Sequence, residues 1–131
     1  MNEYRSNNNI TYVCRYHIVF CPKYRRQVLT PPIDERLKTI LMEQIARWGQ
    51  EWIAMAVMPD HGHLLIGGDP QGGIHRFIKV LKGYSSHTLR LGYPSLKKRL
   101  PSLWTNSYVV ATVGGVTLET VKRSVERHKD R

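Results

Sequence analysis

The chain has 131 residues, of which 41% are hydrophobic, so it is predicted to form one globular domain with a modest core rather than a disordered chain. Lysine and arginine number 20 against 10 acidic residues, and the net charge of +10 favours a polyanionic partner, nucleic acid ahead of an anionic membrane surface. No apolar run approaches the ~20 residues that span a bilayer, and the polar tail 1–9 lacks a signal-peptide core, so we expect a cytoplasmic protein.

The first half of the chain predicts a strand, a helix and two further strands. Residues 11–20 alternate, with Ile18 and Phe20 on one face and Arg15 and His17 on the other, which indicates a strand with one buried face. A basic loop follows at 22–27, and residues 33–48 have helical spacing that ends at Gly49. Residues 51–58 and 62–66 are predicted to be neighbouring strands across a Pro-Asp turn. Cys14 and Cys21 are expected to be free thiols, because their odd spacing places them on opposite faces of the first strand.

The second half predicts a helix over 73–91, an irregular basic stretch over 93–104, a well-buried strand over 107–113 and a last helix over 117–129. The order β-α-β-β-α-β-α predicts a single α+β domain over 1–131. Its sheet is expected to be antiparallel and ferredoxin-like, the arrangement also found in RNA-binding domains, with helices on one face and the last helix as an addition. In that topology the first and third strands are adjacent at the centre.

The third strand carries His61-Gly62-His63, two histidines at i and i+2 that share one side of a sheet. Imidazole is a common ligand of divalent metals near neutral pH, so the pair is a candidate metal site. The alternative is two partly buried or surface histidines with no ligand role. If Leu64 and Ile66 meet the helices, the histidines stand on the open face of the sheet, and the opposite assignment stays open.

The last helix offers a third group for such a site. Ser124 and His128 are four residues apart and lie beside Val121 and Val125 on one face of that helix. Packed over the open sheet face, the helix would present a hydroxyl and an imidazole to a metal. Alternatively, the valines belong to the core and Ser124 and His128 flank them in solvent.

Basic residues gather in clusters with aromatic residues among them, a combination that neutralises phosphates and stacks unpaired bases. The compact segment Lys23-Tyr24-Arg25-Arg26 follows the first strand, and Lys79 and Lys82 lie on the second helix. A solvated helix face is the simpler interpretation of Lys79 and Lys82 taken singly.

Several motifs occur together in order along nearly the whole chain. They are residues 16–26 (YHIVFCPKYRR), 57–64 (VMPDHGHL), Phe77-Ile78-Lys79 with Lys82-Gly83, 103–108 (LWTNSY) and 112–115 (TVGG). In these segments the chain resembles the small single-tyrosine transposases of bacterial and archaeal insertion sequences, members of the HUH superfamily that act on single-stranded DNA.

The resemblance implies a dimeric enzyme that binds DNA hairpins near the ends of a mobile element. A divalent metal, held by the two histidines and a side chain of the last helix, polarises the scissile phosphate. In the enzymes of this family, a tyrosine on the last helix attacks the scissile phosphate, which leaves a 5′-phosphotyrosine link and a free 3′-hydroxyl. By this resemblance, His61, His63 and His128 would hold Mg²⁺ or Mn²⁺, and the hairpin would be gripped by Lys23, Arg25, Arg26, Lys79 and Lys82.

The chain departs from the family pattern at three positions. Ser124 stands where the family has its tyrosine, His128 replaces the usual glutamine ligand, and Gly62 replaces a bulky apolar residue. A serine alkoxide forms less readily than a phenolate, and the shorter side chain ends well before the tyrosine oxygen's position. Tyr108 is not expected to substitute, because it falls in the buried fourth strand. The sequence therefore leaves two functions: a transposase that is inactive or impaired at Ser124, or a non-catalytic hairpin DNA- or RNA-binding module.

Overall fold

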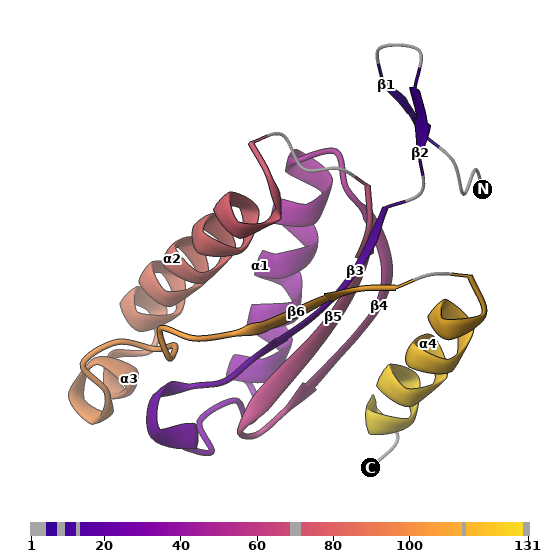
Figure 1. Cartoon of the computed structure of the whole chain (residues 1–131). Helices are drawn as coiled ribbons and strands as arrows, with labels where there is room; N and C mark the ends of the chain where they lie inside the picture. The colour runs from indigo at the N-terminus through magenta and orange to yellow at the C-terminus, as the bar shows by residue number, and fades with distance from the viewer. Residues whose placement is uncertain (1–4, 8–9, 13, 69–71, 114, 130–131) are drawn as a thin grey trace.

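The computed structural model describes the whole chain except residues 1–4, 8–9, 13, 69–71, 114 and 130–131 (Figure 1). A four-stranded antiparallel sheet with the order β4-β5-β3-β6 forms its centre. The strands are β3 (Arg15–Phe20), β4 (Glu51–Met58), β5 (His61–Gly67) and β6 (Val109–Thr112). The helices are α1 (Ile33–Arg47), α2 (Ile74–Gly92), α3 (Pro94–Arg99) and α4 (Gly115–Lys129), with a short 3₁₀ turn, η1 (Lys23–Arg25).

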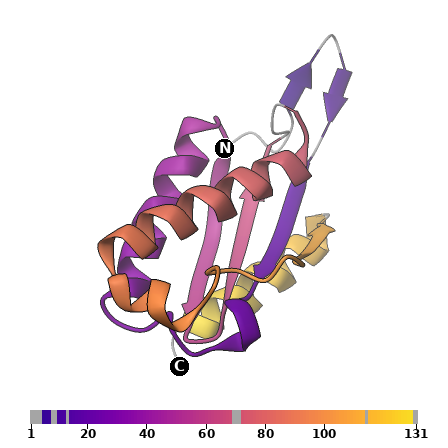
Figure 2. The same cartoon turned by 90° about the vertical axis from the view of Figure 1, so that its left-hand side faces the viewer.

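The predicted α+β fold is confirmed. Predicted strands one and three, β3 and β5, are adjacent at the centre of the sheet, as expected from the element order. Helices α1 and α2 cover one face, and α4 crosses the other (Figures 1 and 2). In the part of the chain that the structure describes, no helix combines the length and the apolar composition needed to cross a membrane.

Two separate apolar clusters lie on the two faces of the sheet. The larger one joins Ile18, Leu64 and Ile66 to apolar side chains of α1 and α2, including Leu37 and Phe77. The smaller one consists of Ala54, Ala56, Leu65, Val113 and Val125, with Ile53 and Val121 packed against it. Because Leu64 and Leu65 point to opposite faces, the strand alternation assigned from sequence is confirmed, and Leu64 and Ile66 meet α1 and α2.

Three regions differ from the predicted elements. The first strand is shorter at its start, because its neighbour β5 ends at Gly67, opposite Arg15. Preceding residues form a separate two-stranded sheet of β1 (Arg5–Asn7) and β2 (Ile10–Tyr12), which projects from the end of the main sheet where a polar tail was expected (Figure 1). Within the predicted irregular stretch lies the short helix α3, which begins at Pro94, a favourable residue for a first helical turn.

The prediction of a well-buried fourth strand is wrong. Strand β6 pairs with β3 alone, at the edge of the sheet, and three of its four residues are exposed. Val109 retains 63% of its accessible surface. The valines of this segment therefore favour a strand without indicating burial, because an edge strand has a neighbour on only one side.

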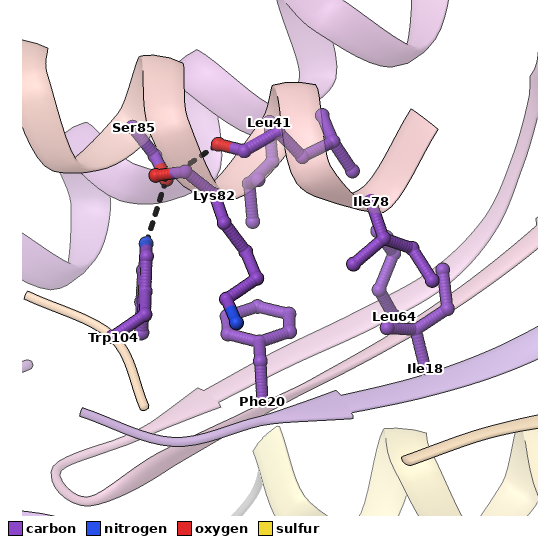
Figure 3. A pocket seen from close by; sticks show the side chains of 9 residues that line it. Ile18, Phe20, Leu41, Leu64, Ile78, Lys82, Ser85 and Trp104 are labelled. Atoms are coloured by element: carbon purple, nitrogen blue, oxygen red, sulfur yellow. Dashed lines mark hydrogen bonds between the residues drawn. The ribbon is translucent and has the colours of Figure 1, made fainter. Parts of the chain in front are cut away.

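The segment after α3 is fastened to both α2 and the end of β3. Trp104 donates a hydrogen bond from Nε1 to Ser85 Oγ (2.9 Å), and the Ser85 hydroxyl donates to the Leu81 carbonyl (2.7 Å) (Figure 3). The backbone N–H of Lys23 donates to the carbonyl of Leu103 (2.8 Å). These bonds hold the basic turn η1 beside the loop that leads into β6.

Candidate metal centre and nucleic-acid interface

His61 and His63 lie on the α4 side of the central strand β5. Gly62 and Leu64 alternate with them and face α1 and α2, so both imidazoles share one face. The centroids of the two rings are 4.9 Å apart and their planes are nearly perpendicular, at 82°. The structure therefore places the two predicted ligands side by side.

Asp60 and Arg25 fix the orientation of His61. The Nδ1 atom of His61 is 2.7 Å from Asp60 Oδ1, and Arg25 Nη2 donates to Asp60 Oδ2 at 3.0 Å. A carboxylate can only accept, so Nδ1 of His61 carries a proton, and in the neutral form of the ring Nε2 has the lone pair that ligation needs. The hydrogen bond from His61 is the main cause of a lowered pKa of the Asp60 carboxyl, and the charges of His61 and Arg25 lower it further.

His17, on β3, is the neighbour of His63. The Nε2 atom of His17 is 3.1 Å from Nδ1 of His63, and the two rings lie edge to edge, with centroids 5.3 Å apart and planes only 11° from parallel. Burial lowers the pKa of His17, which favours the neutral imidazole near pH 7. Sequence reasoning did not include His17 among the site residues, although it placed His17 on the outward face of the first strand.

The donor set fits a divalent transition metal. In both histidines Nδ1 is engaged by a neighbour, so Nε2 is the atom that can ligate, and Nε2 of His63 is buried. Imidazole nitrogen suits Mn²⁺ better than Mg²⁺, which prefers oxygen ligands. Among the described side chains no group of three His, Cys, Asp or Glu residues is arranged to hold a metal. The predicted third ligand, His128, lies in α4, and its side chain falls outside the described residues.

Helix α4 docks on the histidine face through its valines. Val125 is 1% exposed and Val121 is half-buried, and both pack against the small cluster around Leu65. Ser124 is next to them and its side chain is exposed. The predicted helix over the open face is thus present, its valines belong to the core, and Ser124 is at the rim of the contact.

Gly62 leaves space that the ring of Phe20 occupies. Phe20 lies opposite Gly62 in the β3–β5 register and is itself wedged edge-on against Trp104, with ring centroids 5.0 Å apart. A Cβ atom on residue 62 would be 2.7 Å from both Cε2 and Cζ of Phe20. The missing bulky residue of the motif is therefore compensated from the neighbouring strand.

We expect Gly62→Val to destabilise the fold by about 1–3 kcal/mol, because the added side chain would meet the Phe20 ring at 2.7 Å and push that ring out of its packing against Trp104. Phe20→Leu in the same chain should relieve part of this cost, with a coupling on the order of 0.5–3 kcal/mol in a double-mutant cycle. Urea unfolding of the four proteins measures both quantities. Strictly additive effects would show that the two side chains do not compete for this space.

Three of the five predicted basic residues line two hollows. Arg25 lines one of them on the histidine side, with Val19, Cys21, Thr105, Ser107, Tyr108 and Val109. Lys79 and Lys82 line the other, with His75, Arg76, Asn106 and Tyr108. Tyr108 forms a wall of both hollows, and its hydroxyl is 2.6 Å from His75 Nδ1 of α2. Lys23 is half-buried and Arg26 is exposed at or beside η1.

The ammonium group of Lys82 is bound by backbone carbonyls of the segment before β6. It donates to the carbonyls of Thr105 and Asn106 and lies 5.2 Å from the centre of the Tyr108 ring. Burial lowers the pKa of Lys82. Lys79 and Arg76, by contrast, are exposed. Arg76 and His75 were not among the predicted binding residues, and the signal for Arg76 was its helical spacing from Lys79.

Both cysteines are free thiols, as predicted, and the Cys14 thiol donates to the Tyr16 hydroxyl (2.7 Å). The Tyr108 side chain is half-buried, in contrast to the fully buried position expected for it. Its hydroxyl is turned toward α2 rather than toward the histidine pair.

Comparison with known proteins places this geometry in context. Residues 10–128 match the family described as "Transposase IS200 like". The chain is 39% identical to the ISDra2 transposase TnpA of Deinococcus radiodurans over 98% of its own length and 94% of the relative's. It is 33% identical to the transposase for insertion sequence element IS200 of Salmonella typhimurium, over 98% and 88% of the two lengths.

Two solved structures share the fold. A crystal structure of a candidate transposase from Deinococcus radiodurans R1 superposes with a TM-score of 0.76 at 36% identity, covering 95% of this chain and 97% of that one. A REP-associated tyrosine transposase bound to a REP hairpin gives a TM-score of 0.62 at 16% identity, covering 96% of this chain and 69% of that one.

Proposed function

Because the chain belongs to the IS200-like transposase family, we propose that it binds single-stranded DNA carrying a hairpin and holds a backbone phosphate of that strand at the His61–His63 pair. The observation that carries the proposal is the pair itself, which lies on one face of the central strand with each Nδ1 engaged by a neighbour. The relative with TM-score 0.62 is bound to a hairpin, and this supports the choice of ligand.

His61 and His63 would hold Mn²⁺ or Mg²⁺ through their Nε2 atoms, with His128 as a third ligand. A divalent cation supplies Lewis-acid polarisation of a phosphoryl oxygen. Arg25, hydrogen-bonded to Asp60 at the edge of this face, keeps its other N–H groups for an adjacent phosphate. The exposed Lys79 and Arg76, in the second hollow, would neutralise phosphates of the hairpin stem.

Ser124 is poorly suited to act as the nucleophile that would cut the strand. In the family resemblance its position supplies the phenol oxygen that attacks phosphorus and later leaves. A serine hydroxyl is less acidic, its alkoxide is a poorer leaving group, and the side chain is shorter by about the width of a ring. We propose that this chain binds and orients the strand but forms the covalent protein–DNA link slowly or not at all. The same resemblance leads us to propose a homodimer.

An RNA-binding module with the same element order is the main alternative. Such modules stack bases on aromatic side chains exposed on the two central strands. In this chain the corresponding face carries His17, His61 and His63 and is crossed by α4. That arrangement favours a metal-dependent DNA site over base stacking.

The test is hairpin binding measured by fluorescence anisotropy. A labelled single strand with a hairpin is compared with a scrambled strand of equal length, with Mn²⁺ and with EDTA. We expect a preference for the hairpin, and we expect Lys79→Gln to reduce the slope of log affinity against log salt by about 1. Arg36→Gln, an exposed cation on α1, is the matched control for lost charge. Equal affinity for the two strands would refute the proposal.

A further inference from the structure

We propose that His17 is a positioning residue for metal binding: by accepting a hydrogen bond from Nδ1 of His63, it turns Nε2 of His63 toward the metal. The inference rests on the proposed function, since it assumes that the histidine pair holds a divalent cation. In this proposal His17 does for His63 what Asp60 does for His61, whose Nδ1 is hydrogen-bonded to the Asp60 carboxylate.

The sheet register brings His17 to this place. His17 is paired with Leu65 and His63 with Val19, so the two histidines are diagonal neighbours on the same face of adjacent strands. Diagonal neighbours are within reach of long or aromatic side chains. The ring planes are within 11° of parallel, and the distance between Nε2 of His17 and Nδ1 of His63 is 3.1 Å.

The chemistry of ligation requires such a partner. A ligating imidazole is neutral, and the hydrogen bond made by its other nitrogen sets the tautomer and the ring orientation. With its proton on Nδ1, His17 presents an Nε2 lone pair that can accept from His63. The Asp60 carboxylate accepts the corresponding hydrogen bond from Nδ1 of His61, and Arg25 holds that carboxylate in place. Each histidine therefore has its own orienting group, drawn from a different part of the chain.

Two substitutions of His17 distinguish the effect of its hydrogen-bond acceptor from the effect of its ring. His17→Phe keeps a flat ring beside His63 but removes the acceptor, whereas His17→Gln loses the ring and keeps an acceptor atom at similar reach. Free Mn²⁺ is measured by electron paramagnetic resonance during titration of the full chain without DNA. We expect His17→Phe to weaken Mn²⁺ binding by about 10- to 100-fold and His17→Gln to recover most of the affinity. Thermal unfolding without metal checks that both variants fold.

The outcomes separate the inference from the proposed function. If the unsubstituted chain binds Mn²⁺ and the His61→Ala, His63→Ala double variant does not, the metal site stands. An unchanged affinity in His17→Phe, or equal losses in both His17 variants, would then overturn the role of His17 alone. No Mn²⁺ binding by the unsubstituted chain would overturn both.

Discussion

Ser124→Tyr is expected to convert a chain that binds a hairpin-bearing strand into one that becomes covalently attached to it in the presence of Mn²⁺. A tyrosine with a pKa of ~10 yields a phenolate far more readily than serine yields an alkoxide. The longer side chain restores the reach that attack at ~3–3.5 Å requires. In the step, the phenolate oxygen bonds to phosphorus, the 3′ oxygen departs and takes up a proton, and the 5′-phosphate remains on the protein.

The measurement is a denaturing gel of 5′- and 3′-labelled strands, in which only the Ser124→Tyr protein should retain labelled DNA after boiling. Ser124→Phe is the matched control, because it adds the ring without the hydroxyl. The exposed position of Ser124 accommodates either ring without disturbing the core. If the unsubstituted chain cuts as well as Ser124→Tyr, our chemical objection to serine is wrong.

Val125→Asp is expected to release α4 from the sheet while the rest of the fold persists. Val125 is 1% exposed and packs in the smaller of the two clusters, so a carboxylate there costs several kcal/mol unless the helix separates. Among the described side chains, none from α4 belongs to the larger cluster under α1 and α2, which should therefore remain intact. In the Ser124→Tyr background this change should abolish covalent attachment to DNA.

Hydrogen exchange followed by mass spectrometry measures the release directly. Peptides from α4 should lose protection in Val125→Asp, whereas peptides from β5 and α2 should keep most of theirs. Arg127→Gln, which makes the same change in charge at an exposed position of α4, is the control. Protection of α4 equal to that of the unsubstituted chain would show that the helix tolerates the carboxylate.

Local patterns in the sequence were sufficient for the fold and for the His61–His63 pair. The alternation along this strand puts the histidines on the same face as Leu65, and the structure decides that this face is the one opposite the α1–α2 core. Helical spacing located α1, α2 and α4 to within a few residues. These features depend on neighbours in the chain, which a single sequence displays.

Side-chain contacts between segments distant in the sequence were not predicted. The His17–His63 contact joins residues on two strands and follows from register, which no local pattern records. Lys82 looks like any solvated cation in the sequence, yet the carbonyls of Thr105 and Asn106 bind it. The exposure of β6 follows from its place at the sheet edge, so its apolar sequence was misleading.

The apolar side chains form two clusters on opposite faces of the sheet. The cluster under α1 and α2 stabilises the domain, and the cluster under α4 supports the face that carries the histidines. The described side chains of α4 pack in the smaller cluster, so substitutions there are expected to affect that cluster, while the larger cluster maintains the domain. Selection can therefore remove or restore the reacting group without rebuilding the molecule. On the proposed function, a copy with a silent nucleophile would still occupy the hairpins that an active copy needs, and would act as a competitive antagonist whose strength rises with its abundance.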